Sequence, residues 1–136
     1  MQRSNNIDGT VRHTFKKYER LKHQKDIDTL FSIGKAYSVF PISIKYLLVP
    51  RPDSETAPVK AGFSVPKKKF RHAVKRNRVR RLMREAWRLN KHIINTIPPE
   101  KQLHVFFIYQ TTELLKYEMI ETAVLNCIQK LKTLTA

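Results

Sequence analysis

The stretch AGFSVPKKKFRHAVKRNRVRRLMREAWRL, residues 61–89, sets the architecture of the whole chain. It begins as a short apolar segment, continues through three lysines and becomes a helix rich in arginine. Between Lys67 and Lys91 there are twelve Lys or Arg residues and one acid, Glu85. Such a charge density, almost without interspersed acids, indicates a polyanionic partner rather than a simply solvated surface.

Helical periodicity sorts this segment into two faces. At about 100° per residue an apolar stripe forms, suited to packing on a core, and it contains Val79, Leu82, Met83, Ala86, Leu89 and Ile93. The opposite face collects Asn77, Arg80, Arg81, Arg84, Arg88 and Lys91. Like charges at i and i+4 destabilise such a helix by roughly 0.2–0.5 kcal/mol per pair, a cost that bound phosphates would offset. Arg76 lies near the edge of the apolar stripe, so the periodicity does not assign its side chain to the basic face.

The excess of arginine on the helix favours nucleic acid, because the planar guanidinium suits bidentate contacts with phosphates and base edges. Asn77 is a poor helix former between two arginines, and its amide could read a base edge or fix an arginine. The candidate RNA-binding residues are Lys67, Lys68, Lys69, Arg76, Asn77, Arg78, Arg80, Arg81, Arg84 and Arg88.

The same segment resembles the signature of the bacterial ribonuclease P protein subunit. The resemblance rests on GFSVPKK at residues 62–68 and on AVKRNRVRRLMREA at residues 73–86, where spacing matches over more than twenty residues. A weaker similarity extends from about Leu21 to Leu131. The chain departs from many relatives at residues 70–72, where they have Gly or Asn before the Ala-Val pair.

The resemblance implies a fold and a role. The fold is α+β, a small mixed sheet of about four strands with three helices and a left-handed βαβ crossover, whereas about 98% of such crossovers are right-handed. The role is that of the protein subunit of ribonuclease P, which binds the catalytic RNA and the 5′ leader of precursor tRNA during endonucleolytic 5′ maturation. One protein and one RNA would form the ribonucleoprotein.

Length and composition predict one domain in a chain of 136 residues with a net charge of +16. Residues 1–18 lack periodicity and are expected to be a mobile basic tail, with a single RNA-binding domain over residues 19–136. No apolar run is long enough to span a bilayer, and a signal peptide is not evident, so we expect no membrane partner and a cytoplasmic protein. Cys127, the only cysteine, is expected to be a buried apolar group.

Patterning elsewhere predicts the order helix, strand, strand, long helix, strand, helix. The expected elements are a helix over about 25–33, strands over 37–49, 60–66 and 103–110, and a last helix over 117–134 with Ile120, Val124, Cys127, Ile128 and Leu131 as its stripe. Pro41 suggests an edge or a break near the start of the first strand. The run at 103–110 is apolar throughout, as in a central strand buried on both faces.

Four residues are candidates for the leader cleft that the resemblance implies, two by their match to family positions and two by strand alternation. Phe31 matches an aromatic position of the family, whereas Ile27 stands where Phe is common and offers an apolar contact only. Lys45 or Tyr46 would line the same cleft, on alternate faces of the first strand. For Ile27 and Phe31 a core position is the alternative, as it is for Tyr46.

The sequence contains no recognisable catalytic set. Its five histidines lack metal-ligand spacing, and near the basic helix only Glu85 and His72 could act as acid or base. We therefore expect no catalytic residue, no metal site and no cofactor in the protein. The resemblance places catalysis in the RNA partner, through magnesium ions that the RNA binds.

Two other functions remain open on sequence alone. A ribosomal or general RNA-binding protein would have the same composition and basic helix. A DNA-binding module could insert the helix into the major groove, although a strand rather than a helix-turn-helix pair precedes it.

Overall fold

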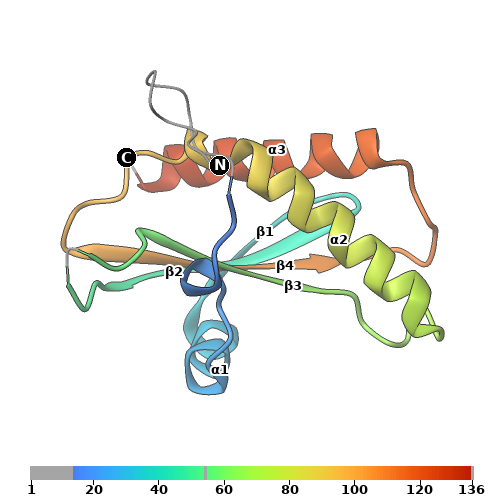
Figure 1. The fold of residues 1–136 in the computed structure, drawn as a ribbon, viewed down its shortest axis with the longest axis horizontal. Coiled ribbons are helices and arrows are strands. Elements are labelled where there is room, and N and C mark those ends of the chain that lie inside the picture. The colour runs from blue at the N-terminus through green and yellow to red at the C-terminus, as the bar shows by residue number, and fades with distance from the viewer. Residues whose placement is uncertain (1–13, 54, 136) are drawn as a thin grey trace, which may run out of the picture.

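The computed structural model describes residues 14–53 and 55–135, which form a four-stranded sheet with helices on both faces (Figure 1). The strand order is β1-β2-β4-β3, with β3 and β4 parallel and the other neighbours antiparallel. Helices α2 and α3 cover one face, and α1 lies on the other. In chain order the elements are η1 (Lys17–Glu19), α1 (Gln24–Ile33), β1 (Lys35–Val39), β2 (Ile42–Pro50), β3 (Val59–Ser64), α2 (Ala73–Asn90), η2 (Lys91–Ile93), β4 (Lys101–Tyr109) and α3 (Tyr117–Thr135). The expected α+β class, with four strands and three α-helices, is confirmed.

The first expected strand is a hairpin of two strands. β1 and β2 meet at a tight turn that contains the cis Phe40–Pro41 peptide bond, and Val39 pairs with Ile42 across it. Proline has no amide hydrogen to donate to a ladder, which agrees with the break expected near Pro41. The turn raises the strand count from the three of the periodicity argument to four.

β4 is the strand that joins the two sides of the molecule. It pairs with β2 and β3, and its side chains alternate between the two faces of the sheet. Toward α2 and α3 it presents Leu103, Val105, Phe107 and Tyr109, all fully buried. Toward α1 it presents Gln102, His104 and Phe106. The central strand buried on both faces is confirmed.

α2 packs on the sheet through the stripe that its sequence predicted. Val79, Met83 and Ala86 are fully buried. Trp87 lies outside that stripe, yet it is 1% exposed and its ring centroid lies 5.5 Å from that of Phe107. The buried face of α2 is therefore wider than periodicity alone indicated.

α3 completes the core on the same face. All five residues of its predicted stripe are fully buried: Ile120, Val124, Cys127, Ile128 and Leu131. Burial raises the pKa of the Cys127 thiol to about 12, so at neutral pH it stays protonated and packs as an apolar group.

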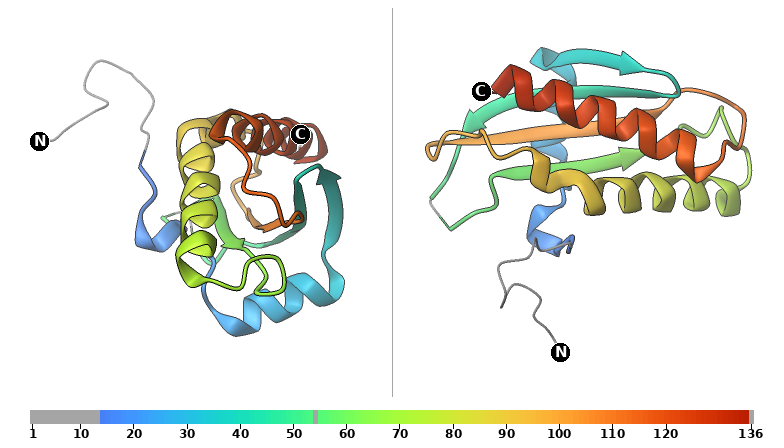
Figure 2. Two further views of the ribbon diagram at one scale, coloured as in Figure 1. Left: turned by 90° about the vertical axis from the view of Figure 1, so that its right-hand side faces the viewer. Right: turned by 90° about the horizontal axis from the view of Figure 1, so that it is seen from above.

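The connection from β3 through α2 to β4 is left-handed. In the right-hand view of Figure 2 the helices face the viewer and both strands run from left to right. β4 lies above β3 in that view, so with the strands turned upright the chain moves to the left as it crosses. This is the unusual hand that the family resemblance implied.

The segment before α1 meets the outer edge of β3 at Ala61. Arg20 forms a parallel bridge with Ala61, and the Leu21 amide donates to the Ala61 carbonyl oxygen at 2.9 Å. This contact interrupts the row of free backbone groups that an edge strand offers to another chain.

The packed part of the chain begins before residue 19. Of the expected tail at residues 1–18, residues 1–13 lie outside those that the structure describes. Phe15 packs against the domain, and its ring meets the Phe63 ring edge-on at a centroid distance of 5.9 Å, whereas residues 16–18 are exposed. This short segment thus helps to build the surface beside α2.

Candidate nucleic-acid interface

Arg76 organises the loop that leads into α2. Its Nη1 donates to the carbonyl oxygens of Phe70, at 2.8 Å, and Arg71, at 2.9 Å. The Phe70 ring is buried and lies 6.0 Å from that of Tyr109. No side chain caps the N-terminus of α2 with a hydrogen bond. The two hydrogen bonds from Arg76 instead fix the loop that leads into the helix. This agrees with the position of Arg76 at the edge of the apolar stripe.

Asn77 fixes an arginine. Its Oδ1 accepts a hydrogen bond from Arg80 Nη1 at 2.7 Å, one helical turn further on. Of the two roles left open by the sequence, this contact corresponds to the second. The Asn77 side chain is exposed, so this bond sits at the surface.

Arg80 and Arg84 border a pocket of about 200 Å³ between α2 and the segment before α1. Two further cations line it from that segment, Arg20 and Lys22. We call this site the basic pocket. Its other lining residues are mostly apolar, namely Phe15, Leu21, Ala61, Gly62 and Phe63. Sequence reasoning missed Arg20 and Lys22, because only the fold brings them to residues about sixty positions later.

The cations of the basic pocket oppose one another. Burial lowers the pKa of the Arg84 guanidinium, and the charges of Arg20, Arg80 and Arg81 lower it further. Both causes disfavour the charged form, and a bound anion would offset both.

Two residues of the predicted basic face are tied to acids. Arg88 forms a two-bond pair with Glu85, at 2.9 Å from Nε and 2.8 Å from Nη2. That hydrogen-bonded pairing raises the pKa of Arg88 and lowers that of Glu85. Lys91 Nζ contacts the Glu19 carboxylate and the Thr14 carbonyl oxygen, so it turns inward rather than outward.

The remaining predicted cations extend the basic surface. Lys67 and Lys68 are exposed in the loop before α2, and Lys69 beside them is half-buried. Arg78 and Arg81 are exposed on α2. The basic surface therefore runs from this loop along the first half of α2.

Phe31 lies on the other side of the sheet, beside α1. Its ring meets the Phe106 ring edge-on at 5.4 Å, yet 42% of the residue is exposed. A Cβ at Gly62 would come within 2.3 Å of the Phe106 ring, so only glycine leaves room for that ring. Gly62 also lines the basic pocket, and the two surfaces therefore adjoin.

Strand register separates Lys45 from Tyr46. Lys45 pairs with Phe106 and shares its face of the sheet, the face of Phe31. Tyr46 pairs with Val105 and packs against the core under the helices. Lys45, Ile27 and Phe31 thus lie on the α1 side, whereas Tyr46 is placed on the opposite side from the expected leader cleft.

Comparison with known proteins identifies the family. A family model described as Ribonuclease P matches residues 15–132. The ribonuclease P protein component of Porphyromonas gingivalis is 42% identical over 109 residues, covering 79% of this chain and 78% of that protein. This chain belongs to the ribonuclease P protein family.

Further relatives agree with this assignment. The ribonuclease P protein component of Pelotomaculum thermopropionicum is 34% identical over 110 residues, which is 81% of this chain and 89% of that protein. The solved ribonuclease P protein of Staphylococcus aureus has the same fold, with a TM-score of 0.64 at 19% identity over 87% of this chain and 98% of that one.

The biochemical role of this chain follows from its family. Ribonuclease P proteins bind RNA and take part in tRNA 5′ processing, as the non-catalytic component of a ribonucleoprotein with the ribonuclease P RNA. Within residues 14–53 and 55–135, no group of three or more His, Cys, Asp or Glu could hold a metal ion. In the same residues no helix has both the length and the apolarity to cross a membrane.

Replacing Arg76 by Ala should lower the free energy of unfolding by about 1 kcal/mol, because the carbonyl oxygens of Phe70 and Arg71 lose a charged hydrogen-bond donor. The loss stays modest because water can reach these partly exposed oxygens and replace part of the interaction. Urea unfolding followed by circular dichroism measures this change. Arg78→Ala is the matched control, since Arg78 is exposed on the same turn, and its effect should stay within about 0.5 kcal/mol. Equal losses in the two variants would contradict a loop-organising role for Arg76.

Proposed function

We propose that this chain docks on the ribonuclease P RNA through the basic pocket and the basic surface around it. The observation that carries the proposal is the convergence of Arg20, Lys22, Arg80 and Arg84 on one pocket. In the described residues no carboxylate is paired with any of these four cations. Four like charges around one pocket are costly without a counter-charge, and an RNA backbone supplies one.

The candidate RNA-contacting residues form two groups, those that are exposed and those whose side chains already make hydrogen bonds within the protein. Lys67, Lys68, Arg78 and Arg81 are exposed, and they would contact phosphates beyond the basic pocket. Arg76, Asn77 and Arg88 make contacts within the protein, so we propose that they act mainly by shaping the surface.

The second part of the proposal is that the sheet face beside α1 holds the 5′ leader of precursor tRNA. Phe31 offers a partly exposed ring that is braced by Phe106, and a braced ring can stack on an unpaired base at little cost in entropy. Lys45 lies on the same face and would meet the backbone, while Ile27 would give an apolar contact. Because Gly62 belongs to both surfaces, a strand held beside Phe31 would pass close to the basic pocket.

We propose that the protein itself holds no cofactor and that magnesium enters through the RNA. The protein would place cations between two polyanions, the ribonuclease P RNA and the precursor. It would thereby lower the magnesium concentration at which one protein, one catalytic RNA and the precursor assemble.

The test is cleavage of a precursor tRNA at low magnesium by this protein and a bacterial ribonuclease P RNA, mixed and separately. We expect release of the 5′ leader by the mixture alone. Cleavage by the protein alone would contradict the division of labour. An inert mixture, in which the protein binds unrelated structured RNAs equally well, would instead favour a general RNA-binding protein.

Replacing Arg84 by Ala should weaken binding to the ribonuclease P RNA and flatten its salt dependence. Loss of one phosphate contact reduces the slope of log K against log salt by about 0.7–0.9. Filter binding between low and moderate salt measures both quantities. Lys132→Ala, which removes an exposed cation from α3, is the control and should leave them near wild type. An Arg84 variant indistinguishable from that control would exclude the basic pocket as the docking site.

Replacing Phe31 by Ala should weaken binding of a precursor with a leader by about five- to 150-fold, the range expected for one lost stacking contact. Mature tRNA, which has no leader, should bind the holoenzyme unchanged. The control is Ile33→Ala, because Ile33 is 66% exposed on the same helix but outside the proposed leader surface. If precursor and mature tRNA lose affinity equally, Phe31 does not contact the leader.

A further inference from the structure

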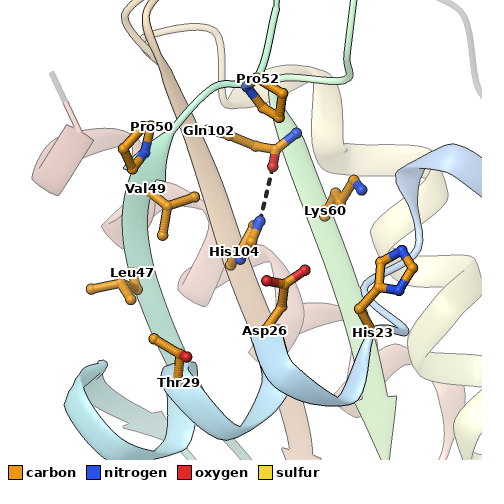
Figure 3. Close-up of a pocket in the computed structure, with 10 residues that line it drawn as sticks. All are labelled: His23, Asp26, Thr29, Leu47, Val49, Pro50, Pro52, Lys60, Gln102 and His104. Carbon is orange, nitrogen blue, oxygen red and sulfur yellow. Dashed lines mark hydrogen bonds between the residues drawn. The ribbon is translucent and has the colours of Figure 1, made fainter.

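A second cavity lies on the α1 side of the sheet, away from Phe31. Its volume is about 410 Å³, and Figure 3 shows the residues that line it, namely His23, Asp26, Thr29, Leu47, Val49, Pro50, Pro52, Lys60, Gln102 and His104. We call it the polar cavity. Its walls come from α1, from β2 and the residues after it, from β3 and from β4.

Helix α1 separates the polar cavity from the proposed leader surface. Leu30 is the one fully buried residue of α1. At about 100° per residue, Asp26 and Thr29 fall on one flank of Leu30, and Ile27 and Phe31 fall on the other. The contacts agree with this division, since the first pair lines the cavity whereas Phe31 meets Phe106. The polar cavity is thus not part of the surface assigned to the leader.

A short hydrogen-bond chain fixes the floor of the cavity. Gln102 Nε2 donates to the carbonyl oxygen of Ala57 at 2.7 Å, which leaves Gln102 Oε1 facing His104 Nε2 at 2.9 Å. A carbonyl oxygen can only accept, so the amide nitrogen must be the atom beside Ala57. His104 Nε2 must then carry the hydrogen, and in the neutral ring Nδ1 keeps its lone pair. Burial lowers the pKa of His104, so the ring is neutral at pH 7.

Asp26 and Lys60 give the cavity its charges. The Asp26 carboxylate is half-buried, and no residue of 14–53 or 55–135 donates a hydrogen bond to it or forms an ion pair with it. The neutral His104 ring does not neutralise it. Lys60, on β3, is the register partner of His104 and lines the same cavity (Figure 3), and it is likewise without a paired carboxylate among the described residues. The two carboxylate oxygens of Asp26 and the ammonium group of Lys60 are therefore available to a ligand.

The chemistry of the cavity favours a nucleobase over the other ligands that a basic protein binds. The Asp26 carboxylate in the lining repels a phosphate, which disfavours a simple anion site. The described His and acidic residues form no group able to hold a metal ion. Leu47, Val49 and Pro50 give one apolar wall, against which the face of a flat ring can lie.

We propose that the polar cavity binds an unpaired guanine of single-stranded RNA. The Watson–Crick edge of guanine presents N1–H and the 2-amino group side by side, which matches the two oxygens of Asp26. Its O6, next in the same row, is an acceptor for Lys60. Adenine, cytosine and uracil lack two adjacent donors beside a carbonyl oxygen. The proposal rests on the RNA binding of the proposed function and adds a base preference to it.

The test measures binding of the full chain to fluorescent twelve-nucleotide uridine RNAs that carry one central guanine, inosine or adenine. We expect guanine to bind at least about fivefold more tightly than adenine, the lower end of what one bidentate base contact contributes. Inosine lacks only the 2-amino group, so it should lose most of that advantage. This comparison uses the unaltered protein and does not depend on the folding of a variant.

Asp26→Asn should abolish the preference for guanine over adenine, because the amide offers one acceptor in place of two. Asp28→Asn is the matched control, since it removes the same charge from the same helix at an exposed position. It should keep the preference. Equal binding of the three RNAs, or equal loss of preference in the two variants, would overturn the proposal.

Precursor cleavage separates this proposal from the proposed function. If the holoenzyme matures the precursor at low magnesium while the three RNAs bind equally, only the guanine site is wrong. If none of the RNAs binds and the mixture is inert, the RNA-binding function fails, and the guanine site fails with it.

Discussion

The burial of β4 on both of its faces is the constraint on which the rest of the structure depends. One set of alternate residues, centred on Phe107, holds α2 and α3 on the sheet. The other set gives His104 to the polar cavity and Phe106 to the surface beside Phe31. A single extended segment therefore supplies the hydrophobic core and the floor of two candidate RNA-contacting surfaces, because side chains on a strand alternate with a period of two.

The same arrangement explains how the chain tolerates its concentration of positive charge. Buried contacts with the sheet hold α2 in place, so the helix does not need favourable charge pairs along its outer face. Arg88 and Lys91, in its last turn and just beyond it, are neutralised by Glu85 and Glu19. Near the middle of the helix, Arg80 and Arg84 instead meet Arg20, and repulsion is concentrated where we propose that RNA docks.

Local patterns predicted the elements well where one physical preference dominated. The stripe of α3 and the apolar run of β4 follow from periodic burial, and both are confirmed. The stripe of α2 is confirmed in part, because Val79, Met83 and Ala86 are buried whereas Leu82, Leu89 and Ile93 are only half-buried. At Pro41 the sequence predicted only an edge or a break in one strand, not a hairpin. β-Branched and aromatic residues are common on both sides of the turn, so composition alone does not show that the chain reverses there. Trp87 was missed, since the width of a buried face depends on what packs against it, here Phe107.

Composition and local patterning were enough to predict a strongly basic chain and most of its helices and strands, and the spacing of the arginine-rich helix pointed to the ribonuclease P family that the comparisons confirm. Which charges meet depends instead on the folded arrangement. Lys91 turns to Glu19, Arg20 joins Arg84, and Tyr46 lies under the helices rather than beside α1. Charge and periodicity are properties of neighbours along the chain, whereas these contacts join segments far apart in sequence. They are set by strand register and by the path of the segment before α1, which local spacing does not encode.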